Sequence, residues 1–385
     1  MQRALVHLDE PYTRNAVVKA LQHSKLEWDI IQDIPEDNSE MDLISATQPI
    51  ALQWLEYELI NWSLLAAREE TTMANAYCIR KGLIRKAQFS YNVSKYLSKN
   101  PESILKQAIP ETWQFELDHI DYIDEALNEV FEVERDLKEN EEKSEEEKKH
   151  VFIIKPSMAN KAAGIHVFDS LDRLCSIFEE PESDEEEEEE EDENYVDEDQ
   201  EDLTQVREWV IQRYISNPLL VNNRKFHVRA YVLAVSNIQV YLYRDMLALF
   251  ALRPYDLNNL SDPLAHISNT CIQTDEADFD EDQSVRLFWE LNKFGIKDQD
   301  LEHMFDQMRN ILKDVFDACA SEMTTFQAVP NAFELFGVDF MIDADNKVYF
   351  LETNAVSFLF SFFLVSLQER MNFHFVSFFF FFFFY

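Results

Sequence analysis

The sequence is poor in glycine and in cysteine. Glycine occurs four times among 385 residues, which excludes collagen-like and glycine-repeat architectures. The cysteines, Cys78, Cys175, Cys271 and Cys319, are far apart and form no CxxC pair, so neither a disulfide framework nor a structural zinc site is predicted. The first residues hold no apolar run long enough for a signal peptide. We therefore expect a reducing compartment, the cytoplasm, with the nucleus as the alternative.

Basic residues are also scarce. The chain has 34 Lys and Arg against 74 Asp and Glu, a formal net charge of −40. Such a field opposes binding to nucleic acid or to an anionic membrane through bulk charge, so we expect neither partner, and we expect a monomer. Apolar residues make up 46% of the chain, which is typical of a globular protein with a buried core.

Much of the acidic charge lies in one block. Of the 21 residues from 182 to 202, 16 are Asp or Glu. This block has too little apolar surface to fold, so we interpret it as a disordered insertion at about residues 180–203. We divide the chain into an N-terminal α/β domain (1–110), a central domain that carries the insertion (111–220), a C-terminal domain (221–354) and a Phe-rich tail (355–385).

The tail is abnormal. Residues 356–385 hold 13 of the 31 Phe and end in seven consecutive Phe and a Tyr. A membrane anchor is one hypothesis, although the charged residues Glu369 and Arg370 divide the apolar runs into pieces that are short for a span. The other hypothesis is translated intron sequence, because Val356-Ser357 can be encoded by a splice-donor sequence and poly-Phe by a T-rich run.

The remaining pattern predicts a mixed α/β protein. Apolar residues at helical spacing predict helices over 50–68, 90–98, 101–108, 283–294 and 300–320. Runs rich in β-branched and aromatic residues predict strands over 4–8, 113–117, 151–155 and 209–215, and hairpins over 225–244 and 333–352.

The last hairpin carries the strongest chemical signal. Alternation on a strand places Glu352 and Asn354 on one face, and pairing in register around the turn brings Asp339 near them. Two carboxylates and an amide oxygen are hard oxygen donors that suit Mg²⁺, whose shell is usually completed by water and nucleotide phosphates. The alternative is an acidic strand end that faces solvent.

Two further segments bring cations to strands. Lys155 ends a predicted strand and is followed by a loop of small residues that can surround phosphate oxygens, although a loop lysine is more often simply solvated. Lys225, His227 and Arg229 share one face of another strand. Three potential cations side by side repel one another unless an anion lies between them, which favours a phosphate or carboxylate site. Arg244 follows on the adjacent strand.

Together these segments resemble the tubulin-tyrosine ligase family of the ATP-grasp superfamily, over about residues 75 to 354 without the insertion. The motifs that carry the resemblance stand in this order in the chain: Lys155-Pro156, Gln212-Arg213-Tyr214-Ile215, Arg224-Lys225-Phe226-His227-Val228-Arg229, Tyr243-Arg244, Ser268-Asn269, Phe336-Gly337-Val338-Asp339-Phe340 and Glu352-Thr353-Asn354. The ordered set is specific, whereas each piece alone is weak.

The resemblance implies an ATP-dependent ligase that joins a free amino acid to a protein carboxylate through an acyl phosphate, with ATP and Mg²⁺ as cofactors and tubulin, or another protein with an acidic tail, as partner. The side chains implied to contact phosphates are Lys86, Lys155 and Lys161. The implied adenine hinge consists of Gln212, Arg213, Tyr214 and Ile215. The implied catalytic cations, which would neutralise the γ-phosphate, the acyl phosphate and a substrate carboxylate, are Lys225, Arg229 and Arg244. Asp339, Glu352 and Asn354 would hold Mg²⁺, and Ser268 and Asn269 would lie near the amino-acid site.

His227 stands where the family usually has an acid. This departure keeps a second hypothesis open, a catalytically weak scaffold of the same fold with nucleotide as a structural ligand. The acidic block also has two interpretations, a solvated loop, which its composition favours, or a mimic of the acidic tubulin tail.

Overall fold

The fold is described from a computed structural model. It covers residues 2–32, 49–117, 119–144, 147–158, 162–179 and 208–355. The acidic block at 182–202, residues 356–385 of the tail and Lys161 lie outside the described residues. Within these ranges the strands form three sheets, two with four strands each and one with seven.

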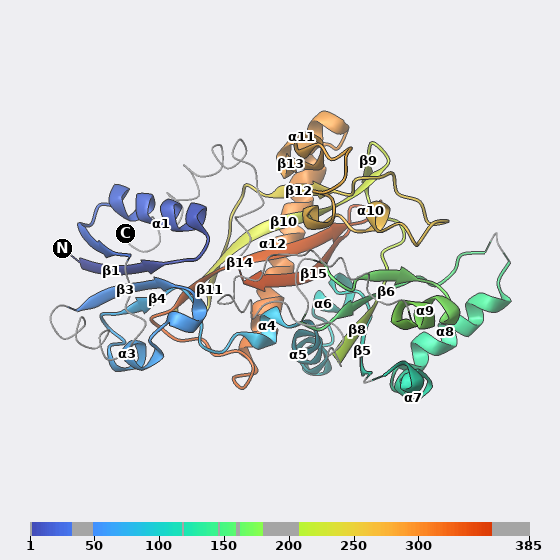
Figure 1. The fold of residues 1–385 in the computed structure, drawn as a ribbon, viewed down its shortest axis with the longest axis horizontal. Helices are drawn as coiled ribbons and strands as arrows, with labels where there is room; N and C mark the ends of the chain where they lie inside the picture. The colour runs from blue at the N-terminus through green and yellow to red at the C-terminus, as the bar shows by residue number, and fades with distance from the viewer. Residues whose placement is uncertain are drawn as a thin grey trace, which may run out of the picture.

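The N-terminal sheet is parallel and has helices on both faces (Figure 1). Its strand order is β2 (Trp28–Ile31), β1 (Gln2–His7), β3 (Ile50–Leu55) and β4 (Met73–Ala74). Alternate residues of β1 explain the two layers. Ala4 and Val6 pack with residues of α1 (Pro11–His23), whereas Leu5 packs with residues of α3 (Trp62–Ala67).

The central sheet is antiparallel, in the order β5 (Thr112–Glu116), β8 (Glu208–Arg213), β6 (Phe152–Pro156) and β7 (His166–Phe168). Phe152 and Ile154 of β6 point into a core built with α7 (Ile123–Leu127), α8 (Phe131–Glu142) and α9 (Leu171–Glu179). Because side chains alternate along a strand, Ile153 and Lys155 occupy the opposite face.

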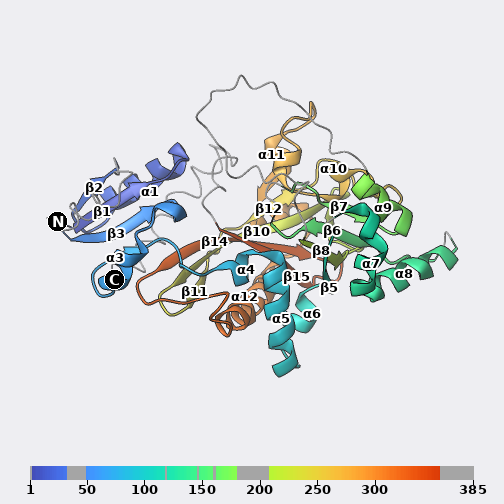
Figure 2. The same ribbon diagram turned by 60° about the horizontal axis from the view of Figure 1, so that its bottom comes forward.

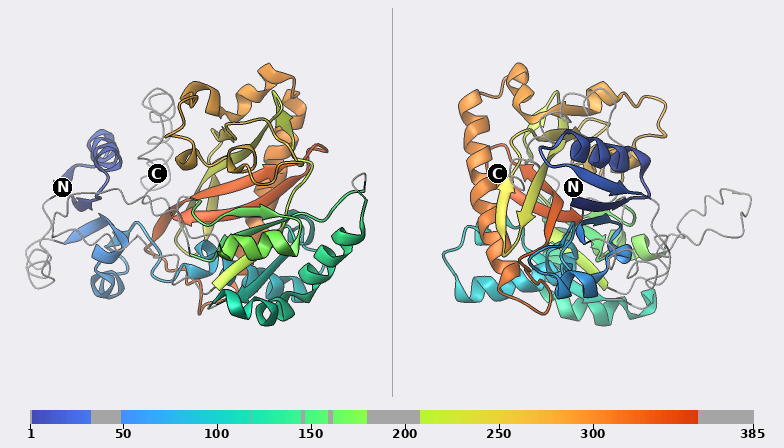
Figure 3. Two further views of the ribbon diagram at one scale, coloured as in Figure 1. Left: turned by 45° about the vertical axis from the view of Figure 1, so that its right-hand side comes forward. Right: turned by 90° about the vertical axis from the view of Figure 1, so that its left-hand side faces the viewer.

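The seven-stranded sheet forms the middle of the molecule. Its main path runs β13 (Val285–Leu287), β12 (Leu247–Phe250), β10 (Arg224–Val235), β14 (Phe333–Ile342) and β15 (Val348–Ala355), and β9 (Leu220–Val221) and β11 (Gln239–Leu242) also pair with β10. In the left view of Figure 3, the green strands of the central sheet lie in front of the red β14 and β15. The face of the large sheet that carries Lys225 faces the central domain, because Lys225 contacts Tyr214, just after β8. We call this the inner face.

Helix α12 (Asp298–Ala320) covers the other face of this sheet (Figure 2). Phe226, Val228 and Ala230 of β10 share a core with its residues Met304 and Met308. Helices α5 (Lys86–Lys99) and α6 (Leu105–Ala108) contribute to the same core. Short helices α4 (Lys81–Ile84), α10 (Pro263–His266) and α11 (Glu281–Ser284) complete the described set. The alternation along β10 leaves Lys225, His227 and Arg229 on the inner face.

Two predicted helices are wrong. Residues 50–68 contain strand β3, a 3-10 turn (Tyr57–Leu59) and only then α3. A parallel strand buried on both faces is apolar throughout, and over a few residues that pattern resembles helical spacing. Residues 283–294 contain the edge strand β13 and a 3-10 helix (Phe288–Phe294), because β13 pairs with β12. Of the helix predicted over 101–108, only α6 is helical.

The other predicted elements are confirmed, with ends that shift by a few residues. The chain reverses between β10 and β11, and between β14 and β15, and both pairs are antiparallel hairpins. Asp343 shapes the second turn, because its carboxylate accepts hydrogen bonds from the backbone N–H groups of Asp345 and Lys347, each at 2.9 Å. No helix in the described ranges is long and apolar enough to cross a membrane.

Candidate active site

The inner faces of the central and large sheets meet in a polar cluster. Lys155 of β6 donates to Gln212 Oε1 of β8 at 3.4 Å. Tyr214, just after β8, accepts a hydrogen bond from Lys225 Nζ of β10 at 3.0 Å, and the same ammonium donates to the His266 carbonyl at 2.7 Å. The strand after the insertion thus connects the lysines of two different sheets.

The final hairpin brings its acids to the same cluster. Asp339 and Glu352 are direct partners across β14 and β15, and Asp339 is also the register partner of Arg229 on β10. The guanidinium of Arg229 donates two hydrogen bonds to Asp339, from Nε to Oδ1 and from Nη2 to Oδ2, the latter at 2.9 Å. Burial alone would lower the pKa of Arg229, but the Asp339 carboxylate raises it. The Arg229 guanidinium therefore keeps its charge inside the protein.

Glu352 lies among cations, with its side chain 20% exposed. Burial alone would raise its pKa, but the charges of Lys86 and Lys155 outweigh burial and lower the pKa of Glu352 to about 2. Lys86 Nζ at the start of α5 lies 3.7 Å from Glu352 Oε2, and Asn354 Nδ2 donates to Oε1 at 3.3 Å. The hairpin thus presents carboxylate oxygens beside ammonium groups, a donor set that suits Mg²⁺ together with phosphates.

Both strand lysines are held in an environment that disfavours their charge. Burial lowers the pKa of Lys155. Burial, with the charge of Lys155 nearby, lowers the pKa of Lys225 to about 7. Two ammonium groups packed together in a low-dielectric interior gain free energy when an anion enters between them. The arrangement is therefore ready to bind a polyanion such as a nucleotide phosphate chain.

His227 lies between these groups on β10. Its Nδ1 is 2.7 Å from Ser268 Oγ, and its Nε2 is 3.6 Å from Asp339 Oδ1. Burial lowers the pKa of His227 to about 4, which outweighs the attraction of the Asp339 carboxylate, so the ring is neutral at pH 7. Ser268, predicted near an amino-acid site, is thus in contact with the cluster, and Asn269 follows it directly at the start of a 3-10 turn (Thr270–Ile272).

Arg244, predicted as a catalytic cation, lies outside the cluster in the described geometry. Its guanidinium is half exposed, stacks 4.1 Å from the Trp289 ring centroid and pairs with Glu302 of α12. The preceding residue, Tyr243, packs with Tyr231 on the inner side of β10, so the chain turns Arg244 toward the helix side. The described geometry gives Arg244 no contact with Lys225 or Arg229.

The side chain of Arg213 also points away from the cluster. It lies on the outer face of the central sheet, 4.5 Å above the Phe152 ring centroid, and donates to Asp136 at 2.8 Å and Glu111 at 3.0 Å. Its backbone N–H donates to the Glu111 carbonyl at 2.8 Å, and that of Tyr214 to Val151 at 2.9 Å. These contacts fix the predicted hinge from behind. If this segment is the adenine hinge, as predicted, its backbone groups, including those of Ile215, would contact the base in place of the Arg213 side chain.

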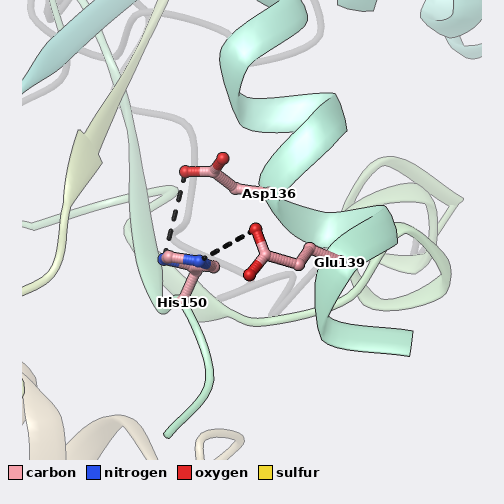
Figure 4. Close-up of side chains that lie close together, drawn as sticks. All are labelled: Asp136, Glu139 and His150. Atoms are coloured by element: carbon pink, nitrogen blue, oxygen red, sulfur yellow. Dashed lines mark ion pairs between the residues drawn. The ribbon is translucent and has the colours of Figure 1, made fainter. Parts of the chain in front are cut away.

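A second set of metal-ligating side chains lies behind the hinge (Figure 4). Asp136, Glu139 and His150 bring one ligand atom each within 4.8 Å of the others. Asp136, however, already accepts hydrogen bonds from Arg213 and Arg135, which outweigh burial and lower its pKa. Two guanidinium groups already neutralise this single carboxylate, so we interpret this trio as a structural ion network.

Sequence reasoning missed His266 and the Asp136 network. His266 contacts the Tyr214 hydroxyl through Nδ1 at 2.9 Å and the Asn259 carbonyl through Nε2 at 3.0 Å, which places it beneath Lys225. The polar alternation around residue 266 was the available signal, but it fits an ordinary half-buried segment equally well. Asp136 meets Arg213 across 77 residues of chain, and local patterns do not report such a distance.

Comparison with known proteins gives a consistent result. The sequence model of the tubulin-tyrosine ligase family matches residues 68–356. A Schizosaccharomyces pombe protein named probable tubulin–tyrosine ligase is 38% identical over 85% of this chain and 81% of its own length. PBY1 of Saccharomyces cerevisiae, named likewise, is 34% identical over 89% of this chain, which spans about half (47%) of that relative.

The fold has a match among solved structures. The C-terminal domain of Pby1 from K. lactis, described as an ATP-grasp enzyme that interacts with the mRNA decapping enzyme Dcp2, superposes with a TM-score of 0.66. The two are 25% identical, and the match covers 97% of this chain and 91% of that one.

Proposed function

Since the chain belongs to the tubulin-tyrosine ligase family and has the ATP-grasp fold, we propose that it is an ATP-dependent ligase that joins an amino acid to a protein carboxylate. One observation carries the proposal beyond the family. The buried lysines Lys155 and Lys225 lie on two facing sheets, and Lys155 interacts with the carboxylates of Asp339 and Glu352. That cluster unites cations for phosphates with oxygen ligands for a divalent ion.

The reaction follows from what such a cluster stabilises. A carboxylate is a poor electrophile, so an oxygen of the acceptor carboxylate first attacks the γ-phosphorus of ATP and ADP leaves. The amine of the amino acid then attacks the acyl carbon, phosphate leaves with the electrons of the C–O bond, and the nitrogen loses a proton. Both steps move negative charge between phosphate oxygens, and fixed cations stabilise that charge in the transition state.

Each residue has a proposed task. Lys86 and Lys155 bind phosphate oxygens, Lys225 and Arg229 neutralise the γ-phosphate and the acyl phosphate, and Lys161 is a further proposed cation.

Gln212 and the backbone from Arg213 to Ile215 hold adenine, with Asn269 near the reacting groups. Asp339, Glu352 and Asn354 would hold Mg²⁺, which supplies charge neutralisation on the phosphates when bound. Arg244 has no task here, because its side chain contacts Glu302.

The proposed acceptor is tubulin or another protein with an acidic tail, in the cytoplasm. The support is the names of the relatives, among them the S. pombe protein and a Bos taurus protein named probable tubulin polyglutamylase TTLL9, 30% identical over 53% of this chain and 48% of its own length. A cation-rich cluster in a chain of net charge −40 also favours an anionic acceptor.

The test is ADP release by the full chain with Mg-ATP, tubulin and a mixture of amino acids, followed by mass spectrometry of the tubulin. We expect ADP release that requires all three substrates and a tubulin mass increased by amino-acid residues. Glu352→Gln should abolish both signals, whereas Glu302→Gln, an exposed control on α12, should leave them unchanged. ADP release without any mass change in tubulin or another acceptor would contradict a ligase.

A second candidate is a nucleotide-binding scaffold without turnover. Two observations favour it: His227 in place of an acid, and the double hydrogen bond between Arg229 and Asp339, which already occupies a proposed metal ligand. The K. lactis relative, described as interacting with Dcp2, is a precedent for a protein partner within this fold. Nucleotide binding with no product for any acceptor would favour this candidate.

A further inference from the structure

The imidazole of His227 has one satisfied and one unsatisfied nitrogen. The side chain is 4% exposed, and Nδ1 contacts Ser268 Oγ at 2.7 Å. Within the described part of the chain, Nε2 has no hydrogen-bond partner. A buried polar atom left without a partner destabilises the folded protein, because it has lost its hydrogen bonds to water. Because this atom lies in the candidate active site, we expect its partner among the molecules that bind there.

The surroundings of Nε2 identify the kind of partner. Asp339 Oδ1 is 3.6 Å away, which is too far for a hydrogen bond. Two ligands of one divalent ion with bonds of about 2.1 Å are roughly 3–3.5 Å apart, close to this separation. Arg229 holds the same carboxylate, but each carboxylate oxygen has a second lone pair that remains available. A cation between His227 and Asp339 would satisfy the ring nitrogen.

Building on the nucleotide site proposed above, we propose that His227 is a nitrogen ligand of the metal that accompanies the nucleotide, and that it biases this site toward Mn²⁺ or Co²⁺ over Mg²⁺. Imidazole suits borderline transition metals, whereas Mg²⁺ prefers an all-oxygen shell. With Nδ1 as the protonated nitrogen, Ser268 Oγ accepts its hydrogen bond and thereby orients the ring with the Nε2 lone pair toward the metal.

Part of the remaining ligand shell comes with the nucleotide. Among the described residues, the group with three such ligand atoms within 4.8 Å is Asp136, Glu139 and His150, not the group at the hairpin. His227 and Asp339 therefore form part of a site, which Glu352, Asn354 and phosphate oxygens complete. Affinity for metal should consequently depend on nucleotide.

Pulsed electron paramagnetic resonance of the full chain with Mn²⁺ and ADP tests the nitrogen ligand directly. We expect a nitrogen coupling that changes when the protein is labelled with ¹⁵N-histidine, which separates His227 from nitrogens of adenine. His227→Asp should lose this coupling, and His303→Asp, on the exposed side of α12, should retain it. Bound Mn²⁺–ADP that couples to phosphorus but to no protein nitrogen would overturn the inference and leave the ligase proposal intact.

Calorimetry gives a second readout that does not depend on turnover. With saturating ADP, we expect the ratio of Mg²⁺ to Mn²⁺ dissociation constants to fall about tenfold or more in His227→Asp relative to the wild type. Ser268→Ala keeps the ring but releases its orientation, and should weaken Mn²⁺ binding by about tenfold. Equal ratios in wild type and His227→Asp would overturn the inference. Failure of the wild type to bind Mn²⁺ and ADP at all would contradict the nucleotide site as well.

Discussion

Two ion clusters, each with a buried aspartate at its centre, lie on opposite faces of the central sheet, and they differ in how completely the protein satisfies their polar atoms. Behind the hinge, Asp136 is paired with Arg213 and Arg135, and His150 lies beside it. On the inner face, His227 Nε2 and Arg229 Nη1 have no hydrogen-bond partner within the described residues. A satisfied cluster stabilises the fold, whereas an unsatisfied one has ligand-binding capacity to spare.

The largest effect should follow from removing the acid that both Arg229 and the proposed metal use. Asp339→Ala leaves a buried guanidinium without its counter-charge, which costs about 3–5 kcal/mol of unfolding free energy. Urea unfolding monitored by circular dichroism measures this loss. The double variant with Arg229→Met should recover part of it, because no charge is then left unpaired. A single variant as stable as wild type would show that the pair is solvated.

The cluster behind the hinge should respond to mutation in stability alone. Asp136→Asn weakens a buried charged contact to Arg213 and should cost about 1–3 kcal/mol, measured in the same way. Affinity for a non-hydrolysable ATP analogue, measured by calorimetry, should stay within about threefold of wild type. Loss of nucleotide binding with unchanged stability would reverse the assignment of the two clusters.

Lys225 gives the inner cluster a dependence on pH. Its pKa is about 7 in the folded protein and 10.5 ordinarily, so the unfolded chain binds more protons between these values. The free energy of unfolding therefore gains from this group as pH rises from 7 toward 10.5, by at most about 1.4 kcal/mol per pH unit. Lys225→Met should flatten that rise in urea unfolding at pH 7 and pH 9, and the exposed control Lys313→Met should preserve it. An unchanged slope in Lys225→Met would refute the lowered pKa of Lys225.

The smallest effect is expected for Arg244. Its pair with Glu302 is exposed, and its contact with Trp289 is a surface cation–π stack, so Arg244→Ala should cost about 1 kcal/mol or less. ATP-analogue affinity and ADP release should remain at wild-type level. A fall in ADP release of a hundredfold with intact folding would return Arg244 to the active site.

The sequence predicted the parts of this site that lie within single strands. Asp339 opposite Glu352, and Lys225, His227 and Arg229 on one face, follow from a period of two and a tight turn. It could not predict contacts that depend on how sheets pack, such as Lys225 with Tyr214 and His266, or Asp136 with Arg213. The helix predicted over 50–68 failed for a related reason, because burial on both faces of β3 erases the alternation that marks a strand.

The most direct test of the central claim is the thermal stability of the full chain with and without a magnesium complex of a non-hydrolysable ATP analogue. If Lys155, Lys225 and the hairpin acids form a nucleotide site, analogue at a hundred times its dissociation constant should stabilise the wild type by about 2.7 kcal/mol. Lys155→Met should lose most of that gain, and Lys313→Met none. Equal stabilisation of wild type and Lys155→Met, or none in either, would contradict the account.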